Sequence, residues 1–202
     1  MKRFFKFGCL GAIGLMVGLV IIGFIIGEDP NDTTTSVEVD DNKSEDAKEV
    51  TASQKDFYLN KTKPKIEELT GMYDKIWDEG WKPTFEALSN GNANIYNAYD
   101  NLKIVRDTYR DLSGVFKSIP VDDLGKEHQK LLESAFSDLR YAAVARQIAA
   151  EKAMEMIDTG NYSPSFMDEI ESQIKSADSQ MISGVASIAI VESELGIIEN
   201  SN

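Results

Sequence analysis

The fold is decided by the last long segment of the chain, residues 163–198, which reads SPSFMDEIESQIKSADSQMISGVASIAIVESELGII. Its apolar and small residues recur at alternating steps of three and four: Met167, Ile170, Ile174, Ala177, Met181, Gly184, Ile188, Val191, Leu195 and Ile198. This spacing places them along one side of an α-helix, as the a and d positions of a heptad repeat. Ser163 and Pro164 supply a helix start. We therefore expect a helix of about 36 residues, about 54 Å long at ~1.5 Å per residue.

The segment before it, from Leu124 to Ile157, has the same helical period. Its middle is rich in alanine, which favours a helix and lets a neighbouring helix approach closely. Thr159-Gly160-Asn161 provides a helix end with a glycine that can adopt a left-handed conformation. Two further helices are indicated upstream of Pro120 by apolar residues at helical spacing: Ile66, Leu69, Tyr73, Ile76 and Trp77, then Phe85, Leu88, Ile95, Tyr99, Leu102, Tyr109, Leu112 and Phe116.

The boundary between the first two helices has two interpretations. Gly80 can end a helix, and Pro83 can open the next one, because proline costs a helix interior about 3 kcal/mol and glycine about 1 kcal/mol. The alternative break is Ser89-Asn90-Gly91-Asn92, which is also a strong turn signal. We expect the break at 80–83, since the apolar pattern keeps its phase from Leu88 to Ile95.

Four helices joined by short loops predict an all-α fold, an elongated antiparallel four-helix bundle over residues 53–200. Strand signals are absent from the sequence. A domain of this size can close a single core without a metal ion or a disulfide. The single cysteine, Cys9, lies outside it, so the bundle contains no disulfide.

Residues 1–27 are expected to be a short cytoplasmic stub followed by a transmembrane anchor over residues 4–27. Residues 7–27 carry no charged or strongly polar side chain, and a helix of that length, about 31 Å, matches a hydrocarbon core of about 30 Å. Lys2, Arg3 and Lys6 precede the run and acidic residues follow it. The positive-inside bias then places the N-terminus in the cytoplasm and the rest of the chain outside the plasma membrane.

Two other readings of this segment fit less well. A cleaved signal peptide has an apolar region of about 7–15 residues and a small-x-small site, whereas this run is longer and ends in FIIG at 24–27. A lipoprotein signal places its cysteine after the apolar stretch, whereas Cys9 precedes most of it. Glycines on one side of the anchor suggest pairing of two such helices in a homodimer: Gly8, Gly11, Gly14 and Gly18.

Residues 28–52 are expected to be a disordered acidic linker. They hold nine acidic and two basic residues and no aromatic residue, so they cannot bury enough apolar area to offset chain entropy. As a coil this linker would span about 25–30 Å. The chain's net charge is −13, and without Lys2, Arg3 and Lys6 it becomes −16. Nucleic acid is therefore not an expected partner.

The sequence offers no catalytic or metal-binding constellation, so we expect no enzymatic activity, no cofactor and no metal. His128 is the only histidine, and Gly125 stands where the Glu-x-x-His pattern of di-iron bundles requires glutamate. Phosphate-binding loops, nucleophile elbows and paired-histidine zinc motifs are missing. His128 is better explained as a structural or solvent-facing residue.

Aromatic residues gather in the first half of the bundle. Trp77 and Trp81 can be core residues at helical spacing or can contribute to a contact surface. Tyr96 lies off the apolar seam and is expected to face outward. Together these three are the candidate interaction aromatics.

The opening MKRFFKFGCLGAIG resembles the anchors of small membrane-tethered proteins of Gram-positive bacteria. The likeness covers about 27 residues and implies a plasma-membrane protein that faces the cell wall. Such proteins display many unrelated outer domains, so the helical domain is not identified by it.

The expected function is that of a membrane-anchored extracytoplasmic bundle that contacts another protein. One alternative is a ligand-binding or sensory bundle that works with a membrane partner. Another is an immunity or exclusion protein of a mobile element, for which the sequence itself offers no test.

Overall fold

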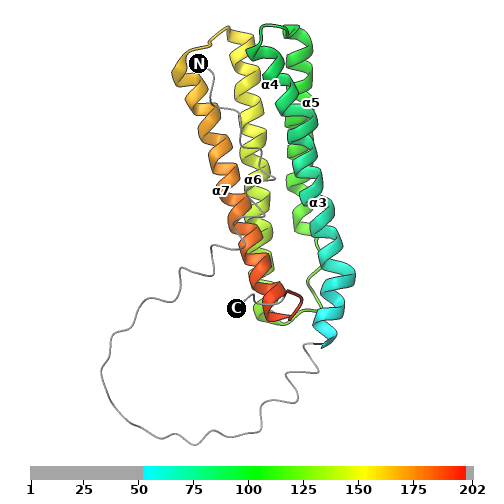
Figure 1. Cartoon of the computed structure of the whole chain (residues 1–202). Helices are drawn as coiled ribbons and strands as arrows, with labels where there is room; N and C mark the ends of the chain where they lie inside the picture. Colours follow the sequence, from blue (N-terminus) through cyan, green and yellow to red (C-terminus); the bar gives the residue numbers. More distant parts are fainter. Residues whose placement is uncertain (1–51, 199–202) are drawn as a thin grey trace, which may run out of the picture. The chain divides into compact units, whose positions relative to one another are not determined.

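The computed structural model describes residues 52–198, which form four helices and contain no strand (Figure 1). The expectation of an all-α bundle is therefore confirmed for this part of the chain. The expected anchor, its glycine stripe, most of the linker and residues 199–200 lie outside the described residues. Within 52–198, no helix is long and apolar enough to cross a membrane.

The first helix is continuous from residue 52 to residue 89 and contains two π-helical segments. After residues 52–57 it comprises η1 (Tyr58–Thr62), α3 (Lys63–Lys75), η2 (Ile76–Trp81) and α4 (Lys82–Ser89). The other elements are α5 (Ile95–Val115) with the 3₁₀ turn η3 (Phe116–Ser118), α6 (Lys126–Thr159) and α7 (Pro164–Glu194).

The expected break at 80–83 is wrong, and the chain turns instead at Asn90–Asn92, where Gly91 has a φ of +67°. The two π-helical segments explain how the helix passes its prolines. At the end of η2 the Lys82 N–H donates to the Trp77 carbonyl, five residues back. The wider turn leaves room for the ring of Pro83, which would otherwise clash with a carbonyl of the preceding turn.

The same arrangement precedes the other proline of this helix. At the end of η1 the Lys63 N–H donates to the Tyr58 carbonyl, and Pro64 follows at the start of α3. Each Lys-Pro pair therefore begins a new α-helical run directly after a π-helical turn, and the helix continues in both cases.

Gly80 serves helix packing rather than helix termination. A Cβ atom at this position would lie 2.6 Å from Cγ2 of Val105 on α5, closer than side chains approach. The first helix packs on α5 through α3, η2 and α4. The glycine that looked like a helix end is therefore the point where two helices come closest.

α6 is the central helix and packs against both α5 and α7 (Figure 1). Its alanines Ala142, Ala143, Ala149, Ala150 and Ala153 are fully buried, as the alanine-rich sequence led us to expect. Where α7 crosses α6, a Cβ on Gly184 would lie 2.9 Å from Leu139 Cδ2 and 3.0 Å from the Ala135 carbonyl oxygen. Small residues therefore set the close approach of α6 and α7.

The heptad seam of α7 is confirmed along most of its length. Its buried members are Ile170, Ala177, Gly184, Ile188, Val191 and Leu195. The helix is shorter than expected and ends at Glu194, because Gly196 adopts a φ of +63° and its N–H donates to the Ser193 carbonyl. Gly160, with a φ of +64°, ends α6 as predicted.

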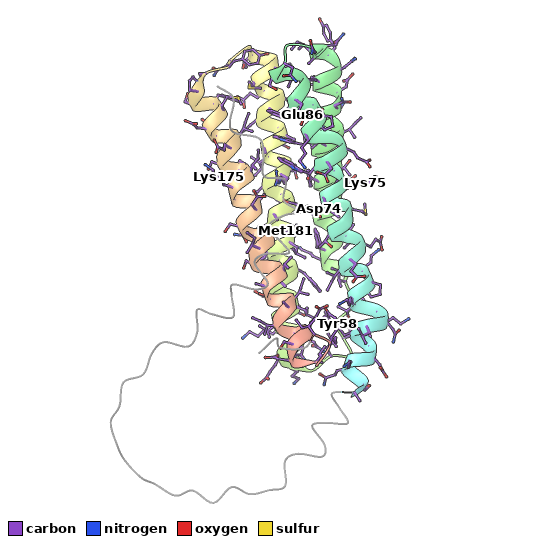
Figure 2. The ribbon with its side chains drawn as sticks, viewed as in Figure 1. Tyr58, Asp74, Lys75, Glu86, Lys175 and Met181 are labelled. Carbon is purple, nitrogen blue, oxygen red and sulfur yellow. The ribbon has the colours of Figure 1, made fainter. Side chains whose placement is uncertain are left out.

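The first helix and α7 meet at the end of the bundle that carries residues 52 and 198, where Figure 2 shows Tyr58. The Tyr58 hydroxyl donates to Glu192 Oε1 at 3.1 Å, and Lys63 pairs with the same oxygen at 2.8 Å. Lys55 Nζ donates to the Gly196 carbonyl at 2.6 Å. Burial, with the nearby Glu192 carboxylate, raises the pKa of Tyr58, so it stays neutral. These bonds hold the start of the first helix to the end of the last.

Candidate functional site

A buried arginine connects three helices near the middle of the bundle. Arg146 of α6 is 3% exposed. Its Nε donates to the Tyr73 hydroxyl at 3.1 Å, and its Nη2 pairs with Asp178 Oδ1 of α7 at 2.5 Å. Nη1 is buried and has no hydrogen-bond partner among the described residues. Tyr73 and Asp178 compensate the charge of Arg146, because a buried charge without partners is strongly destabilising.

The guanidinium of Arg146 also lies over the ring of Trp77, with 3.6 Å between Cζ and the ring centroid. Trp77 stacks on Trp81 at 5.3 Å, and Trp81 stacks on Phe85 at 4.4 Å. The three rings are four residues apart, which places them on one face of a helix. The guanidinium and the three stacked rings thus form one row along the first helix. The positive charge of Arg146 is attracted by the quadrupole of the Trp77 indole beneath it.

A second contact ties α5 to this cluster. The Tyr109 hydroxyl donates to the Tyr73 carbonyl at 3.1 Å, and the two rings meet edge to face at 5.2 Å. Burial raises the pKa of Tyr109, so its hydroxyl keeps the proton that it donates. All four helices therefore contribute to one polar and aromatic centre around Arg146.

Arg146 was not predicted from the sequence as a functional residue. Arg146 lies in phase with residues on the buried face of α6, and this phase was the signal in the sequence that its side chain is buried. These residues are Leu139, Ala142, Ala149 and Ala153. Only the folded structure brings Tyr73 and Asp178 against Arg146, and these partners allow a charge at this buried position. The Asp178 side chain is 39% exposed, so the ion pair lies at the edge of the core. The arrangement ties α6 to the first helix through Tyr73 and to α7 through Asp178.

Asp74 lies beside this centre on the side of α3 that faces the bundle, whereas Lys75 lies on the outer side (Figure 2). Burial raises the pKa of Asp74, and Asp78 raises it further, while Arg146 and Lys82 act in the opposite direction. A raised pKa in the folded state means that ionised Asp74 costs stability at neutral pH. That cost disappears as the pH falls through the folded-state pKa.

We expect Asp74→Asn to raise the melting temperature at pH 7, by the equivalent of less than about 1 kcal/mol because the side chain is only half-buried. The gain should shrink as the pH is lowered toward the range in which Asp74 takes up its proton. Circular dichroism melts at several pH values check this. Asp100→Asn, at an exposed position on α5, is the matched control. An equal gain in both variants, or one that grows on acidification, would contradict the assignment.

The three candidate interaction aromatics lie in different environments. Trp81 is 3% exposed and belongs to the core, so it is not a surface contact residue. Trp77 is half-buried beneath Arg146. Tyr96 is 82% exposed, which confirms that it faces outward. The structure therefore separates one exposed aromatic from two that stabilise the bundle.

Tyr96 belongs to an uncharged surface at one end of the bundle. The α4–α5 and α6–α7 connections lie at the same end (Figure 1), and residues 87–99 and 159–167 contain no Asp, Glu, Lys or Arg. We call the surface formed by these two ranges the loop end. Its exposed large apolar and aromatic residues are Ile95, Tyr96, Tyr162 and Met167.

His128 contacts two other helices. Its Nδ1 lies 3.0 Å from Gln54 Oε1 of the first helix, and its Nε2 lies 3.2 Å from Glu194 Oε2 of α7. The expected structural role is consistent with these contacts. Within residues 52–198, no group of three or more His, Cys, Asp or Glu side chains is arranged to hold a metal ion.

Comparison with known proteins provides no family for this chain. No family model, no curated protein and no solved structure matches it.

Proposed function

We propose that the chain is a single-pass plasma-membrane protein that binds a partner protein outside the cell through the loop end of its helical bundle. In this proposal residues 4–27 are the anchor, the N-terminus is cytoplasmic, residues 28–52 are a spacer and the bundle has no catalytic role. The observation that carries the proposal is the composition and exposure of the loop end.

The absence of charge at the loop end stands out in an acidic chain. More than a quarter of all residues are charged and the net charge is −13, yet two separate segments without charge lie at the same end of the bundle (Figure 1). The cores of protein interfaces are depleted of Asp, Glu and Lys and enriched in Tyr and Met. Tyr96 and Met167 at the loop end, at 82% and 40% exposure, fit this pattern.

The polar residues of the loop end support the same conclusion. The stretches SNGNANIYN at 89–97 and TGNYSPS at 159–165 consist mostly of Asn, Ser, Gly and Tyr. This composition is typical of binding loops, in which tyrosine provides rigid contact area and Asn and Ser provide adaptable hydrogen bonds. The loops are also held in place, since the Asn94 side chain caps α5 by accepting from the Tyr96 and Asn97 N–H groups.

Residue-specific crosslinking in intact membranes tests this proposal. A photoreactive phenylalanine analogue is placed at position 96, 162 or 141 of the full-length chain. Tyr141 is the matched control, because it is 51% exposed on the side of α6 and Tyr162 is 54% exposed at the loop end. We expect one defined adduct from positions 96 and 162 and none from position 141.

The double variant Tyr96→Ala/Tyr162→Ala should weaken the captured complex at least about tenfold, since exposed tyrosines at interface centres contribute about 1–2 kcal/mol or more. Tyr141→Ala should leave it unchanged. Adducts of equal yield at all three positions would contradict a docking role for the loop end. A defined enzymatic turnover by the purified protein would contradict the non-catalytic part of the proposal.

A further inference from the structure

A second feature, independent of the loop end, lies between the η3–α6 connection and the side of α6. It is a surface pocket of about 440 Å³, within the range of small-molecule sites. Four of its lining side chains are charged: Lys117 and Arg140 are basic, and Asp122 and Glu133 are acidic. We call it the four-charge pocket.

None of these four charges has an ion-pair partner among residues 52–198. Elsewhere on the bundle Lys63 pairs with Glu192 and Lys152 with Glu169, whereas Lys103 and Lys130, like the pocket cations, have no ion-pair partner among the described residues. Two cations and two carboxylates therefore line one pocket without neutralising each other. The pocket has no net charge, although the chain carries −13.

The pocket wall is fixed by hydrogen bonds. Thr62 Oγ1 of the first helix donates to the Pro120 carbonyl at 2.7 Å. From the α6 side, Gln129 Nε2 donates to the carbonyls of Asp122 and Leu124 at 2.9 and 2.8 Å. The connection that carries Asp122 is thus held from two helices, and a preformed wall lowers the entropic cost of binding a ligand.

The charges define the chemistry of a ligand. A simple anion in the pocket would meet Asp122 and Glu133, and a simple cation would meet Lys117 and Arg140, so each would gain one attraction and suffer one repulsion. A molecule that carries both signs satisfies both pairs. The guanidinium of Arg140 can bind a carboxylate through two parallel hydrogen bonds, and Glu133 can accept from an ammonium group.

The same pocket also contains an apolar surface. Ile119 and Phe136 line it and are only 4% and 5% exposed, so they form its floor. We propose that the four-charge pocket binds a small zwitterion, namely a free α-amino acid with an apolar side chain. Its carboxylate is bound by Arg140 and Lys117, its ammonium by Glu133 and Asp122, and its side chain by the floor.

Isothermal titration calorimetry on the full-length chain in detergent micelles tests the ligand class with three probes. L-Leucine carries both charges, leucinamide lacks the carboxylate, and N-acetyl-leucine lacks the ammonium. We expect saturable binding of L-leucine and at least about tenfold weaker binding of the other two, about 1.4 kcal/mol per tenfold. No saturation with L-leucine up to about 10 mM, or equal binding of either singly charged probe, would overturn the proposal.

Variants test the location. Arg140→Gln and Glu133→Gln should each weaken L-leucine binding at least about tenfold. Lys130→Gln is the matched control, because Lys130 is an exposed cation of α6 that does not line the pocket. Circular dichroism confirms that each variant is folded. Equal affinity in Arg140→Gln and Lys130→Gln would place binding elsewhere and refute the assignment.

The loop end and the four-charge pocket share no residue. Tyr96→Ala/Tyr162→Ala should therefore leave L-leucine binding unchanged, and the failure of one proposal does not imply the failure of the other.

Discussion

Replacing Asp178 with alanine is expected to lower the free energy of unfolding by about 2–3 kcal/mol. Asp178 is the only carboxylate within the described residues that pairs with the buried guanidinium of Arg146. Removing one partner of a fully buried pair costs about 3–5 kcal/mol, because the other charge is left without compensation. The Asp178 side chain is 39% exposed. Water can therefore partly take the place of the carboxylate beside Arg146 in the variant, and the expected loss of stability is lower than for a fully buried pair.

The double variant Arg146→Met/Asp178→Ala is expected to be at least as stable as the unmodified protein. Arg146 already leaves Nη1 without a hydrogen-bond partner among the described residues. Methionine keeps much of the packing against Trp77 without the charge. Exchange of a buried ion pair for apolar residues of similar volume is often neutral or stabilising by about 1–4 kcal/mol. The second substitution should therefore reverse the effect of the first.

Urea unfolding of the full-length chain, followed by circular dichroism, measures both variants. Glu171→Ala is the matched control on the same helix, because the Lys175–Glu171 pair is exposed, with side chains 73% and 60% accessible, and such pairs contribute about 0–1 kcal/mol. If Asp178→Ala changes the free energy of unfolding no more than Glu171→Ala does, the buried charge of Arg146 does not depend on Asp178, and the prediction is wrong. If the double variant is the least stable of all, the ion pair itself stabilises the fold.

Gly80→Ala is expected to destabilise the bundle by about 1–3 kcal/mol, the usual cost of inserting a methyl group into a packed core. The added Cβ would lie 2.6 Å from Val105 Cγ2. The opposite sign is expected for Gly71→Ala, since a Cβ there meets no atom within 4 Å. At such a helix interior position alanine gains about 0.5–1 kcal/mol over glycine.

A double-mutant cycle with Val105→Ala identifies the cause. Val105→Ala alone loses buried methyl groups and should destabilise, but in the presence of Gly80→Ala it also removes the clash. The double variant should therefore be more stable than the sum of the single effects predicts, with a coupling of about 0.5–3 kcal/mol for residues in contact. Strict additivity would mean that Gly80 acts through its backbone conformation, as a helix end would, and would contradict the close contact of η2 with α5.

The wrong helix boundary shows where local rules fail. Gly80 and Pro83 are each unfavourable in a helix interior, and their combined cost made a break at 80–83 the better choice from the sequence. In the structure η2 widens the turn before Pro83. Val105 packs closely against Gly80, because glycine has no side chain that would clash with it. A π-helical turn is locally poor, so the contacts across the bundle decide whether the helix continues.

Some features of the candidate sites could be predicted from the sequence, and others became visible only in the structure. The outward position of Tyr96 followed from its place off the apolar seam, and the structure confirms it. Trp81 could not be assigned from spacing alone, because core and contact aromatics share the same period. The four-charge pocket left no sequence signal, since Lys117 and Arg140 reach it from different elements.

By itself the sequence determined the features that depend on neighbours along the chain. The heptad seam of 163–198, the glycine that ends α6 at Gly160 and the absence of strand patterns specify a helical bundle, because helix formation and capping are governed by residues within a few positions. The tertiary structure alone decided where a charge can be buried. Arg146 reaches Tyr73 and Asp178 across 73 and 32 residues of chain, and no local pattern records partners that only folding brings together.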